Sequence, residues 1–362
     1  MPDTPVLMRQ AVLREPRRID LVSRAIPEPG PGEVLLRIRA ALTCGTDLKT
    51  YRRGHPRLPF GPFGHECAGD VAATGSGVRA VREGDEVVPT PTAPCNACPS
   101  CRAGRENLCE RLFEGIVLGA YADYLLVSSK VAATNLFRKP AHLSYIEAAF
   151  LEPLACVVHG WARLGPAPVE QVAVVGLGAI GLLHIALARS RGARVTAVGR
   201  RPERLALARR LGADAAADTA ALDTPGVHDG DRDIGQAIRD VSGGAGPDLV
   251  IECTGQEQMW TQAPAWTRRG GRVLLFAGLP GGTRAAFDAT RLHYDEIDIV
   301  HSFHYRPPDV AEALRLLADG RIGVRPIVSG VRDLAAIAAI FAALDRGEGV
   351  KYAILPEDAG WV

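Results

Sequence analysis

The sequence predicts an α/β protein with two domains, one rich in β-strands and one built on a doubly wound parallel sheet. The chain has 362 residues, which at ~150 residues per domain favours two cores over one. Residues 1–150 alternate short β-like runs with Gly and Pro turns, as in EVLLRIRAAL and ADYLLVSS. From QVAVVGLG onward, strand-like runs alternate with helix-length apolar patterns, which is typical of a parallel sheet covered by helices.

The individual elements follow the same two sequence patterns. The first region also contains the strand signals AGDVAATG and DEVVPT, and the second contains RVTAVG, DLVIECTG and RVLLFAGLP. PDVAEALRLLADG and LAAIAAIFAALDRG predict two later helices, each ending at a Gly. The apolar run AAIAAIFAAL can bury against a partner or against its own domain. Residues 219–233 are polar and rich in turn formers, so they predict a surface insertion.

Composition and charge narrow the class of protein. The chain is 47% hydrophobic and 23% charged with a net charge of +1, which gives no reason to expect nucleic-acid or membrane partners. No window reaches ~18 consecutive apolar residues, and the first residues lack a basic head followed by an apolar run. We therefore expect a cytoplasmic protein. In a reducing cytosol, clustered cysteines bind metal more often than they form disulfides.

Half of the eight cysteines stand in one short segment, Cys95, Cys98, Cys101 and Cys109, with the spacing C-x2-C-x2-C-x7-C. Four thiolates that converge within ~2.3 Å suit a tetrahedral zinc ion and leave no open position for a substrate. An iron–sulfur cluster also uses short cysteine runs, so spacing alone leaves iron open. The nearby arginines are balanced by glutamates, which argues against a nucleic-acid-binding zinc module.

A glycine motif marks a nucleotide site. Gly176, Gly178 and Gly181 form G-x-G-x-x-G around Ala179 and Ile180, after an apolar strand and before a helical run. The first glycine makes the turn, the second admits a pyrophosphate and the third lets helix and strand pack closely. The helix N-terminus then favours the phosphate charge.

Taken together and in order, these motifs resemble the zinc-dependent medium-chain dehydrogenase/reductase family, in its sorbitol (polyol) and threonine dehydrogenase-like branch. The marks are CGTD, GHECAGDVAATGSGV, the four-cysteine loop, LEPL, VVGLGAIG and DLVIECTG, which span nearly the whole chain. The resemblance implies a GroES-like catalytic domain of residues 1–154 and 297–362, and a Rossmann dinucleotide-binding domain of residues 155–296. It also implies two zinc ions per chain, one catalytic and one structural.

The resemblance further implies which residues hold the catalytic zinc. Cys44 and His65 become ligands, and Glu152 stands where the alcohol branch of the family has a cysteine. Either Glu66 ligates the metal directly, or Glu152 holds the water bound to it, and we assign both to the site. Asp47 resembles the carboxylate that orients the ligating imidazole.

The reaction needs a proton path as well as a metal. An alcohol has to lose its proton before its carbon releases hydride, and an open zinc site favours the alkoxide as a Lewis acid. Thr46 stands where the family has a hydroxyl that passes this proton onward. Lys49 occupies a position where many relatives carry a relay histidine, so the outer route differs, and Lys49 can instead contact the ribose or a polar substrate.

The cofactor preference is predicted from the second strand of the nucleotide domain. RVTAVG ends at Gly199, where NAD-specific members place an acid on the ribose, and Arg200 and Arg201 follow. Missing acid and added positive charge favour NADP(H) over NAD(H). The family places two later turns against the nicotinamide, with the residues Thr254, Ala277 and Gly278.

Substrate residues are expected from the CGTD loop and from HSFHY. The candidates are aromatic side chains with polar tips, which suit a hydroxylated chain or ring. They are Tyr51, Phe303, His304 and Tyr305, with Phe60 and Phe63 equally well interpreted as core.

We therefore expect an oxidoreductase that transfers hydride between NADP(H) or NAD(H) and a secondary alcohol or ketone. A polyol, sugar, cyclitol or amino alcohol is the expected substrate, and a homodimer or homotetramer the expected assembly. The alternatives are a zinc-independent quinone or enoyl reductase, which lacks Cys44, His65 and the cysteine lobe, and a non-catalytic zinc-stabilised nucleotide-binding module.

Overall fold

The computed structural model describes residues 7–55, 59–220, 234–241 and 244–356, and the chain divides into two compact units. Unit 1 takes its residues from Met1–Ala155, Tyr305–Gly320 and Ile327–Val362. Unit 2 takes Cys156–His304 and Arg321–Pro326. The expected insertion at 219–233 lies almost entirely outside the described residues.

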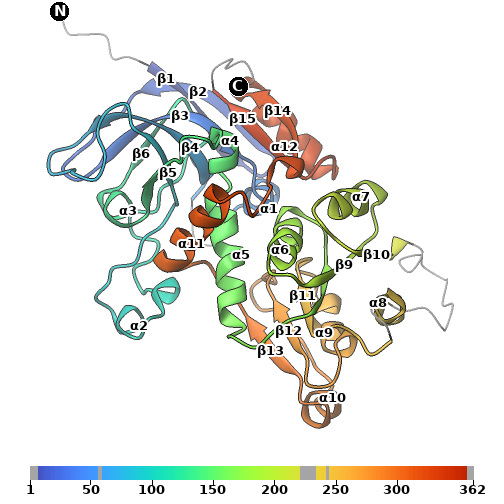
Figure 1. Cartoon of the computed structure of the whole chain (residues 1–362). Coiled ribbons are helices and arrows are strands. Elements are labelled where there is room, and N and C mark those ends of the chain that lie inside the picture. Colours follow the sequence, from blue (N-terminus) through green and yellow to red (C-terminus); the bar gives the residue numbers. More distant parts are fainter. Residues whose placement is uncertain (1–6, 56–58, 221–233, 242–243, 357–362) are drawn as a thin grey trace, which may run out of the picture. The chain divides into compact units, whose positions relative to one another are not determined.

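Over the described residues, unit 1 is built on a mixed seven-stranded sheet and a two-stranded one (Figure 1). The larger sheet has the order β14-β15-β3-β4-β5-β7, with β6 paired to β3, and the smaller joins β1 to β2. Its strands are β1 (Leu7–Glu15), β2 (Arg18–Ala25), β3 (Val34–Leu42), β4 (Glu66–Thr74), β5 (Glu86–Pro89), β6 (Tyr124–Val127), β7 (Leu136–Arg138), β14 (Val328–Asp333) and β15 (Lys351–Leu355).

Among the described helices that lie wholly in unit 1, the longest has 12 residues and the others have nine or fewer. They are α1 (Gly45–Arg53), α2 (Pro99–Arg102), α3 (Ser129–Thr134), α4 (Tyr145–Ala148), α11 (Pro307–Ala318) and α12 (Ile337–Asp345), with 3-10 turns at Glu106–Leu108 and Leu334–Ala336. Helix α12 is the apolar run near the end of the chain. Its Ile337, Ile340, Phe341 and Leu344 are buried in the core of unit 1, so this run packs against its own domain.

Unit 2 has, over its described residues, a six-stranded sheet in which all neighbours pair in parallel, in the order β10-β9-β8-β11-β12-β13. The strands are β8 (Gln171–Val175), β9 (Arg194–Gly199), β10 (Ala215–Asp218), β11 (Leu249–Glu252), β12 (Arg272–Leu275) and β13 (Asp298–His301). The strand order reverses direction between β8 and β11, and ligands bind at such a switch point in open α/β sheets.

Helices connect these strands and pack on them. They are α6 (Ala179–Ser190), α7 (Pro202–Arg210), α8 (Ile234–Val241), α9 (Glu257–Trp266) and α10 (Ala289–Tyr294). Helix α6 packs against β8 and β9, α7 against β9 and β10, and α9 against β11 and β12. The unit 1–unit 2 boundary falls inside a further helix, α5 (Leu151–Arg163). A 3-10 turn at Arg325–Ile327 marks the last return to unit 1.

The boundary after the parallel sheet differs from the expected one. We placed residues 297–362 with the β-rich domain, but β13 pairs in register with β12, from Asp298 opposite Arg272 to His301 opposite Leu275. The sixth strand therefore goes with unit 2, and the chain enters unit 1 at Tyr305. Residues 321–326 also return to unit 2. The apolar run DIVH is too short for sequence periodicity to assign it to one domain or the other.

Candidate metal centres and dinucleotide pocket

The four-cysteine loop folds into a compact lobe in unit 1. The thiols of Cys95, Cys98, Cys101 and Cys109 are free, and their sulfur atoms all lie within 4.8 Å of one another. The Cys95–Cys101 sulfur distance is 3.9 Å and the Cys98–Cys101 distance is 3.5 Å. Four sulfurs at ~2.3 Å from a tetrahedral ion stand about 3.8 Å apart. The geometry therefore fits a closed four-thiolate zinc site.

Backbone hydrogen bonds favour the thiolate form of Cys95 in this lobe. The Cys98 N–H donates to Cys95 Sγ at 3.3 Å, and the Cys95 N–H donates to Cys109 Sγ at 3.2 Å. Backbone N–H groups of Ala97 and Cys98 lower the pKa of Cys95 to about 6. Since a metal binds the thiolate, this hydrogen bonding favours the ligand state. The lobe thus forms the structural zinc site.

A second cluster stands at the end of β3 and the start of β4. The ligand atoms of Cys44, His65 and Glu66 lie within 4.8 Å of one another. Cys44 is the N-cap of α1, and its sulfur accepts the Thr46 N–H at 3.4 Å, which aims the side chain along the helix entrance. Three donors of sulfur, nitrogen and oxygen, with no fourth protein ligand in the group, are typical of an open zinc site.

A carboxylate and a phenol hold the imidazole of this cluster. His65 Nδ1 lies 3.1 Å from Asp47 Oδ1, and the Tyr121 hydroxyl donates to Asp47 Oδ2 at 2.6 Å. A histidine that donates through Nδ1 to a carboxylate presents its other ring nitrogen to a metal. The sequence indicated Asp47 but not Tyr121, which is buried and stands 74 residues further along the chain.

Glu66 is held by a lysine from the far end of the chain. The Lys351 ammonium bonds Glu66 Oε2, and it also donates to the Thr43 carbonyl at 2.7 Å. Both side chains are buried, at 0% exposure for Glu66 and 1% for Lys351. Among the described residues, Glu66 Oε1 has no hydrogen-bond partner. Because a buried carboxylate oxygen without a partner is costly, this atom fits a metal ligand.

The pKa shifts of Cys44, His65 and Glu66 also favour a bound cation. Burial and the nearby Glu66 raise the pKa of the Cys44 thiol, and burial raises the pKa of Glu66 although Lys351 opposes it. Burial tends to lower the pKa of His65, but Asp47 and Cys44 outweigh it and the net pKa is raised. The raised pKa values of Cys44 and Glu66 show that these buried acids resist negative charge, and the raised pKa of His65 shows that its surroundings favour positive charge. A divalent cation would supply that positive charge, so the donor set fits zinc.

Other residues expected at this cluster have different positions. Among the described residues, Glu152, in the first turn of α5, falls outside the group formed by Cys44, His65 and Glu66. Thr46 and Lys49 are exposed on α1. Tyr51 was expected to contact substrate, but it is buried in the core, with its ring 5.5 Å from that of Phe341. Its ring packs in the core of unit 1, and its substrate contact stays a prediction.

The remaining aromatic candidates are distributed between the units. Phe63 is buried in the core of unit 1 against Tyr121, whereas Phe60 is 46% exposed. Phe303 is exposed, and His304 has a left-handed backbone with φ of 60°. The Tyr305 hydroxyl lies 3.1 Å from Thr92 Oγ1, and the residue is 2% exposed. The substrate roles of Phe303, His304 and Tyr305 stay predictions.

In unit 2, the glycine motif forms a turn between β8 and α6. Gly176 has φ of 95°, a backbone that favours glycine, and a Cβ atom at Gly181 would stand 2.0 Å from the Gly176 carbonyl oxygen. Gly178 caps α6, which begins at Ala179. The turn therefore leaves backbone N–H groups exposed at the helix entrance, where an anion binds.

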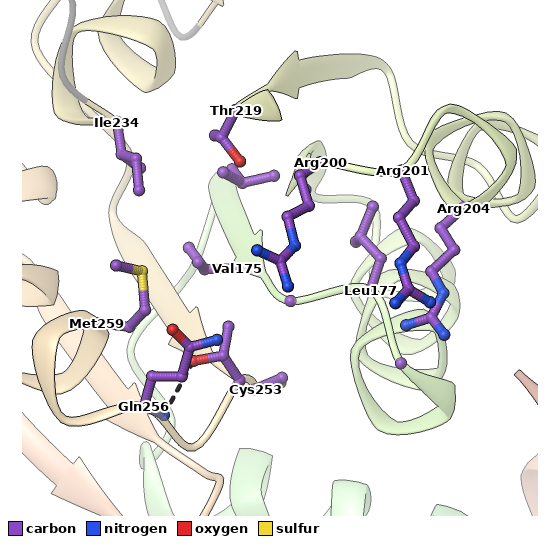
Figure 2. A pocket seen from close by; sticks show the side chains of 15 residues that line it. Val175, Leu177, Arg200, Arg201, Arg204, Thr219, Ile234, Cys253, Gln256 and Met259 are labelled. Atoms are coloured by element: carbon purple, nitrogen blue, oxygen red, sulfur yellow. Dashed lines mark hydrogen bonds between the residues drawn. The ribbon is translucent and has the colours of Figure 1, made fainter. Parts of the chain in front are cut away.

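A cavity of about 280 Å³ opens at this turn (Figure 2). Gly176, Gly178 and Gly199 line it, and so do Arg200 and Arg201. Its lining also includes residues that the sequence analysis did not select, namely Arg204, Thr219, Ile234, Gln256 and Met259. Thr254 lines the cavity as well, whereas Ala179, Ile180, Gly181, Ala277 and Gly278 are not among the lining residues.

Three guanidinium groups gather on one side of the cavity. Arg201 is the N-cap of α7, and Arg204 follows one turn later, so the two side chains lie together in Figure 2. Burial and the charge of Arg201 lower the pKa of Arg204. Positive charges gathered at one place in a cavity favour a bound anion. The spacing of Arg201 and Arg204 on one helix face was a signal available in the sequence.

No helix among the described residues is long and apolar enough to cross a membrane.

The zinc lobe generates a first prediction. Cys98→Ala removes one of four thiolates, so the protein should lose one zinc ion per chain and about 4 kcal/mol or more of unfolding free energy. Elemental analysis and thermal unfolding measure this, with Ser100→Ala in the same lobe as the matched control. Loss of turnover at unchanged zinc content and unchanged melting temperature would contradict a structural role.

A second prediction concerns the buried ion pair. Lys351→Met leaves the Glu66 carboxylate buried without its cation and should lower the unfolding free energy by about 3–5 kcal/mol. The double variant Glu66→Gln with Lys351→Met removes the unpaired charge and should recover part of that loss. Urea unfolding of the wild type, of Lys351→Met, of Glu66→Gln and of the double variant gives the coupling energy between the two charges. Additive losses would show that the two charges do not stabilise each other.

The chain is similar to known proteins over most of its length. Residues 30–138 match the alcohol dehydrogenase GroES-like domain, and residues 179–319 match the zinc-binding dehydrogenase domain. A sorbitol dehydrogenase of Bacillus subtilis is 31% identical, with 90% of each chain covered. An L-galactonate-5-dehydrogenase of Escherichia coli K12 is 31% identical, with 87% of this chain and 88% of that chain covered.

Solved structures agree with this relationship. A presumed zinc-binding dehydrogenase of Sinorhizobium meliloti 1021, determined bound to NADP, superposes with a TM-score of 0.87 at 32% identity, covering 97% of this chain and all of that one. The fold is thus a GroES-like domain followed by a six-stranded Rossmann sheet. The chain belongs to the zinc-binding medium-chain alcohol dehydrogenase family, as an NAD(P)-dependent dehydrogenase of its polyol and sugar-acid branch.

Proposed function

We propose that this enzyme oxidises a secondary alcohol of a polyol, sugar or related polyhydroxylated compound with NADP⁺, or reduces the matching ketone with NADPH. The observation that carries the proposal is the cluster of Cys44, His65 and Glu66, with its partnerless carboxylate oxygen. The four-cysteine lobe of the same unit has four thiolates and therefore offers no open position for a substrate.

The metal would be held by Cys44, His65 and Glu66. Bound there, zinc supplies a Lewis acid that favours the alkoxide form of the substrate. Asp47 keeps the Nδ1 proton of His65 and so fixes the ring orientation. Lys351 bonds Oε2 of Glu66, and Oε1 has no hydrogen-bond partner among the described residues. This arrangement supports Glu66 as a ligand, and Glu152 as a group that acts outside the three-residue set.

The substrate proton would leave through Thr46. Its hydroxyl is carried on the first turn of α1, two residues after Cys44, and the side chain is exposed. Lys49 is exposed one turn later on the same helix and would act at the outer end of this route or on the ribose. A hydroxyl relay moves a proton at the Oγ1 atom without itself becoming charged at neutral pH.

The preference for NADP(H) rests on Arg200, Arg201 and Arg204 in a cavity without an acid at Gly199. A 2′-phosphate accepts charge-assisted hydrogen bonds from guanidinium groups, whereas a ribose 2′-hydroxyl gains little from them. The S. meliloti relative bound to NADP supports the same preference. Hydride would then pass between the substrate carbon and the nicotinamide.

The polyhydroxylated substrate class follows the names of the relatives, a sorbitol and an L-galactonate dehydrogenase. We further propose a cytoplasmic homodimer or homotetramer, which is what the resemblance to this family implies.

The catalytic assignment is tested by Cys44→Ala and His65→Ala. Each variant removes a proposed ligand, so turnover of a polyol panel should fall at least ~1,000-fold, and the metal content should fall from two to one zinc per chain. NADP⁺ affinity should stay within threefold of the wild-type value, because the cavity lies in other elements. His142→Ala, an exposed histidine of the same unit, is the matched control. Turnover that survives in either variant refutes the mechanism.

The cofactor assignment is tested by Arg201→Ala and Arg204→Ala. Each should raise the Kd of NADP⁺ about tenfold or more, because one charge-assisted contact to the 2′-phosphate is lost, with little change for NAD⁺. Arg210→Ala, at the exposed end of α7, serves as control. A wild-type enzyme that uses NAD(H) with equal or higher kcat/KM overturns the preference.

A further inference from the structure

Glu252, the last residue of β11, carries a carboxylate with 0% exposure that belongs to neither metal cluster. Its Oε1 accepts the Thr254 N–H at 2.6 Å and the Gly255 N–H at 3.1 Å, and the Thr254 hydroxyl donates to the same atom. A buried carboxylate whose hydrogen-bond donors come from one turn stabilises that turn. Any other conformation of the turn would leave the carboxylate without those hydrogen bonds.

The backbone of Glu252 holds a second turn. Its carbonyl accepts the N–H groups of Phe276 at 3.1 Å and Ala277 at 3.2 Å. The Trp260 indole, on α9, donates to the Ala277 carbonyl at 2.8 Å. Glu252 and Trp260 therefore connect the turn that follows β11 to the turn that follows β12. These are the turns that the sequence analysis expected at the nicotinamide.

The first of these turns also packs directly on the glycine motif. A Cβ atom at Gly176 would stand 2.7 Å from Thr254 Cγ2 and 3.0 Å from the Thr254 nitrogen. Cys253 and Thr254 line the cavity together with Gly176. Since there is no spare space between the two turns, a shift of Thr254 would change the shape of the cavity wall.

The carboxylate also determines which polar groups the turn can offer. With no cis peptide bond in the described chain, each N–H that points to Glu252 sends the preceding carbonyl the opposite way. The carbonyls of Cys253 and Thr254 thus face away from the buried charge. Carbonyls accept hydrogen bonds from hydroxyl and amide groups, which NAD⁺ and NADP⁺ share, and they repel phosphate oxygens.

We infer that Glu252 is a positioning residue of the dinucleotide site, whose carboxylate holds residues 253–255 in the shape that binds the part common to NAD⁺ and NADP⁺. The inference rests on dinucleotide binding in this cavity and is independent of the proposed preference for NADP(H). Glu252 would act through Thr254 and Gly255 without touching the cofactor, and its loss would raise the cost of ordering the turn on binding.

The test compares Glu252→Ala and Glu252→Gln with Glu257→Gln, an exposed glutamate of the adjacent helix. Calorimetry gives the Kd of NADP⁺ and of NAD⁺ for each folded variant, and thermal unfolding gives stability. Glu252→Ala should raise both Kd values by the same factor, about tenfold or more, with kcat at saturating cofactor little changed. Glu252→Gln keeps one acceptor oxygen and should lose about threefold. Glu257→Gln should match the wild type.

Two outcomes would overturn the inference. One is a Glu252→Ala protein that melts at a lower temperature yet binds both cofactors as the wild type does. That result would show that Glu252 only contributes to packing. The other is a loss confined to NADP⁺, which would place the effect at the 2′-phosphate. If the alanine variant does not fold, wild-type affinity in Glu252→Gln overturns it equally. A wild-type preference for NAD⁺ would contradict only the proposed cofactor.

Discussion

The position of the reactive cluster depends on one buried ion pair. Glu66 begins β4 and Lys351 begins β15, and these two strands flank β3 in the same sheet. Two charges without exposed surface are tolerated only when each finds its counter-charge and its hydrogen bonds. Lys351 meets that condition by bonding both Glu66 and the Thr43 carbonyl, where β3 has just ended. The next residue is Cys44, so the pair fixes the point from which the thiol is presented.

The second support of the cluster is a chain of acceptors and donors that runs outward from the imidazole. Asp47 receives His65 on one oxygen and Tyr121 on the other. Burial and Asp47 raise the pKa of the Tyr121 hydroxyl, so this phenol stays protonated and remains a donor across the physiological range. Tyr121 in turn packs edge-on against Phe63 and Phe341 in the core of unit 1. The ligand orientation is thereby tied to the packing of α12.

Sequence reasoning found the features whose residues stand close together in the chain. The four cysteines, the three glycines and the pair Arg200 and Arg201 each form a local pattern, and the alternation of strands and helices predicted the parallel sheet. Contacts between distant segments were predicted only where the family resemblance implied them, as for Cys44, Asp47 and His65. Lys351 stands 285 residues from Glu66, and no local pattern marks a buried lysine. The core packing of Tyr51 was not predicted either, because an aromatic residue near a ligand motif indicates substrate contact and core packing equally well.

Glu66 and Glu252 show why burial alone does not assign a role to a carboxylate. Both have 0% exposure and a pKa raised by burial. The oxygens of Glu252 accept from Thr254 and Gly255, so its charge is satisfied within its own turn. Glu66 is bonded through Oε2, whereas Oε1 has no partner among the described residues. Its carboxylate lies within 4.8 Å of the ligand atoms of Cys44 and His65. An unsatisfied anion among soft and borderline donors attracts a cation, whereas a satisfied one can only hold the backbone that surrounds it.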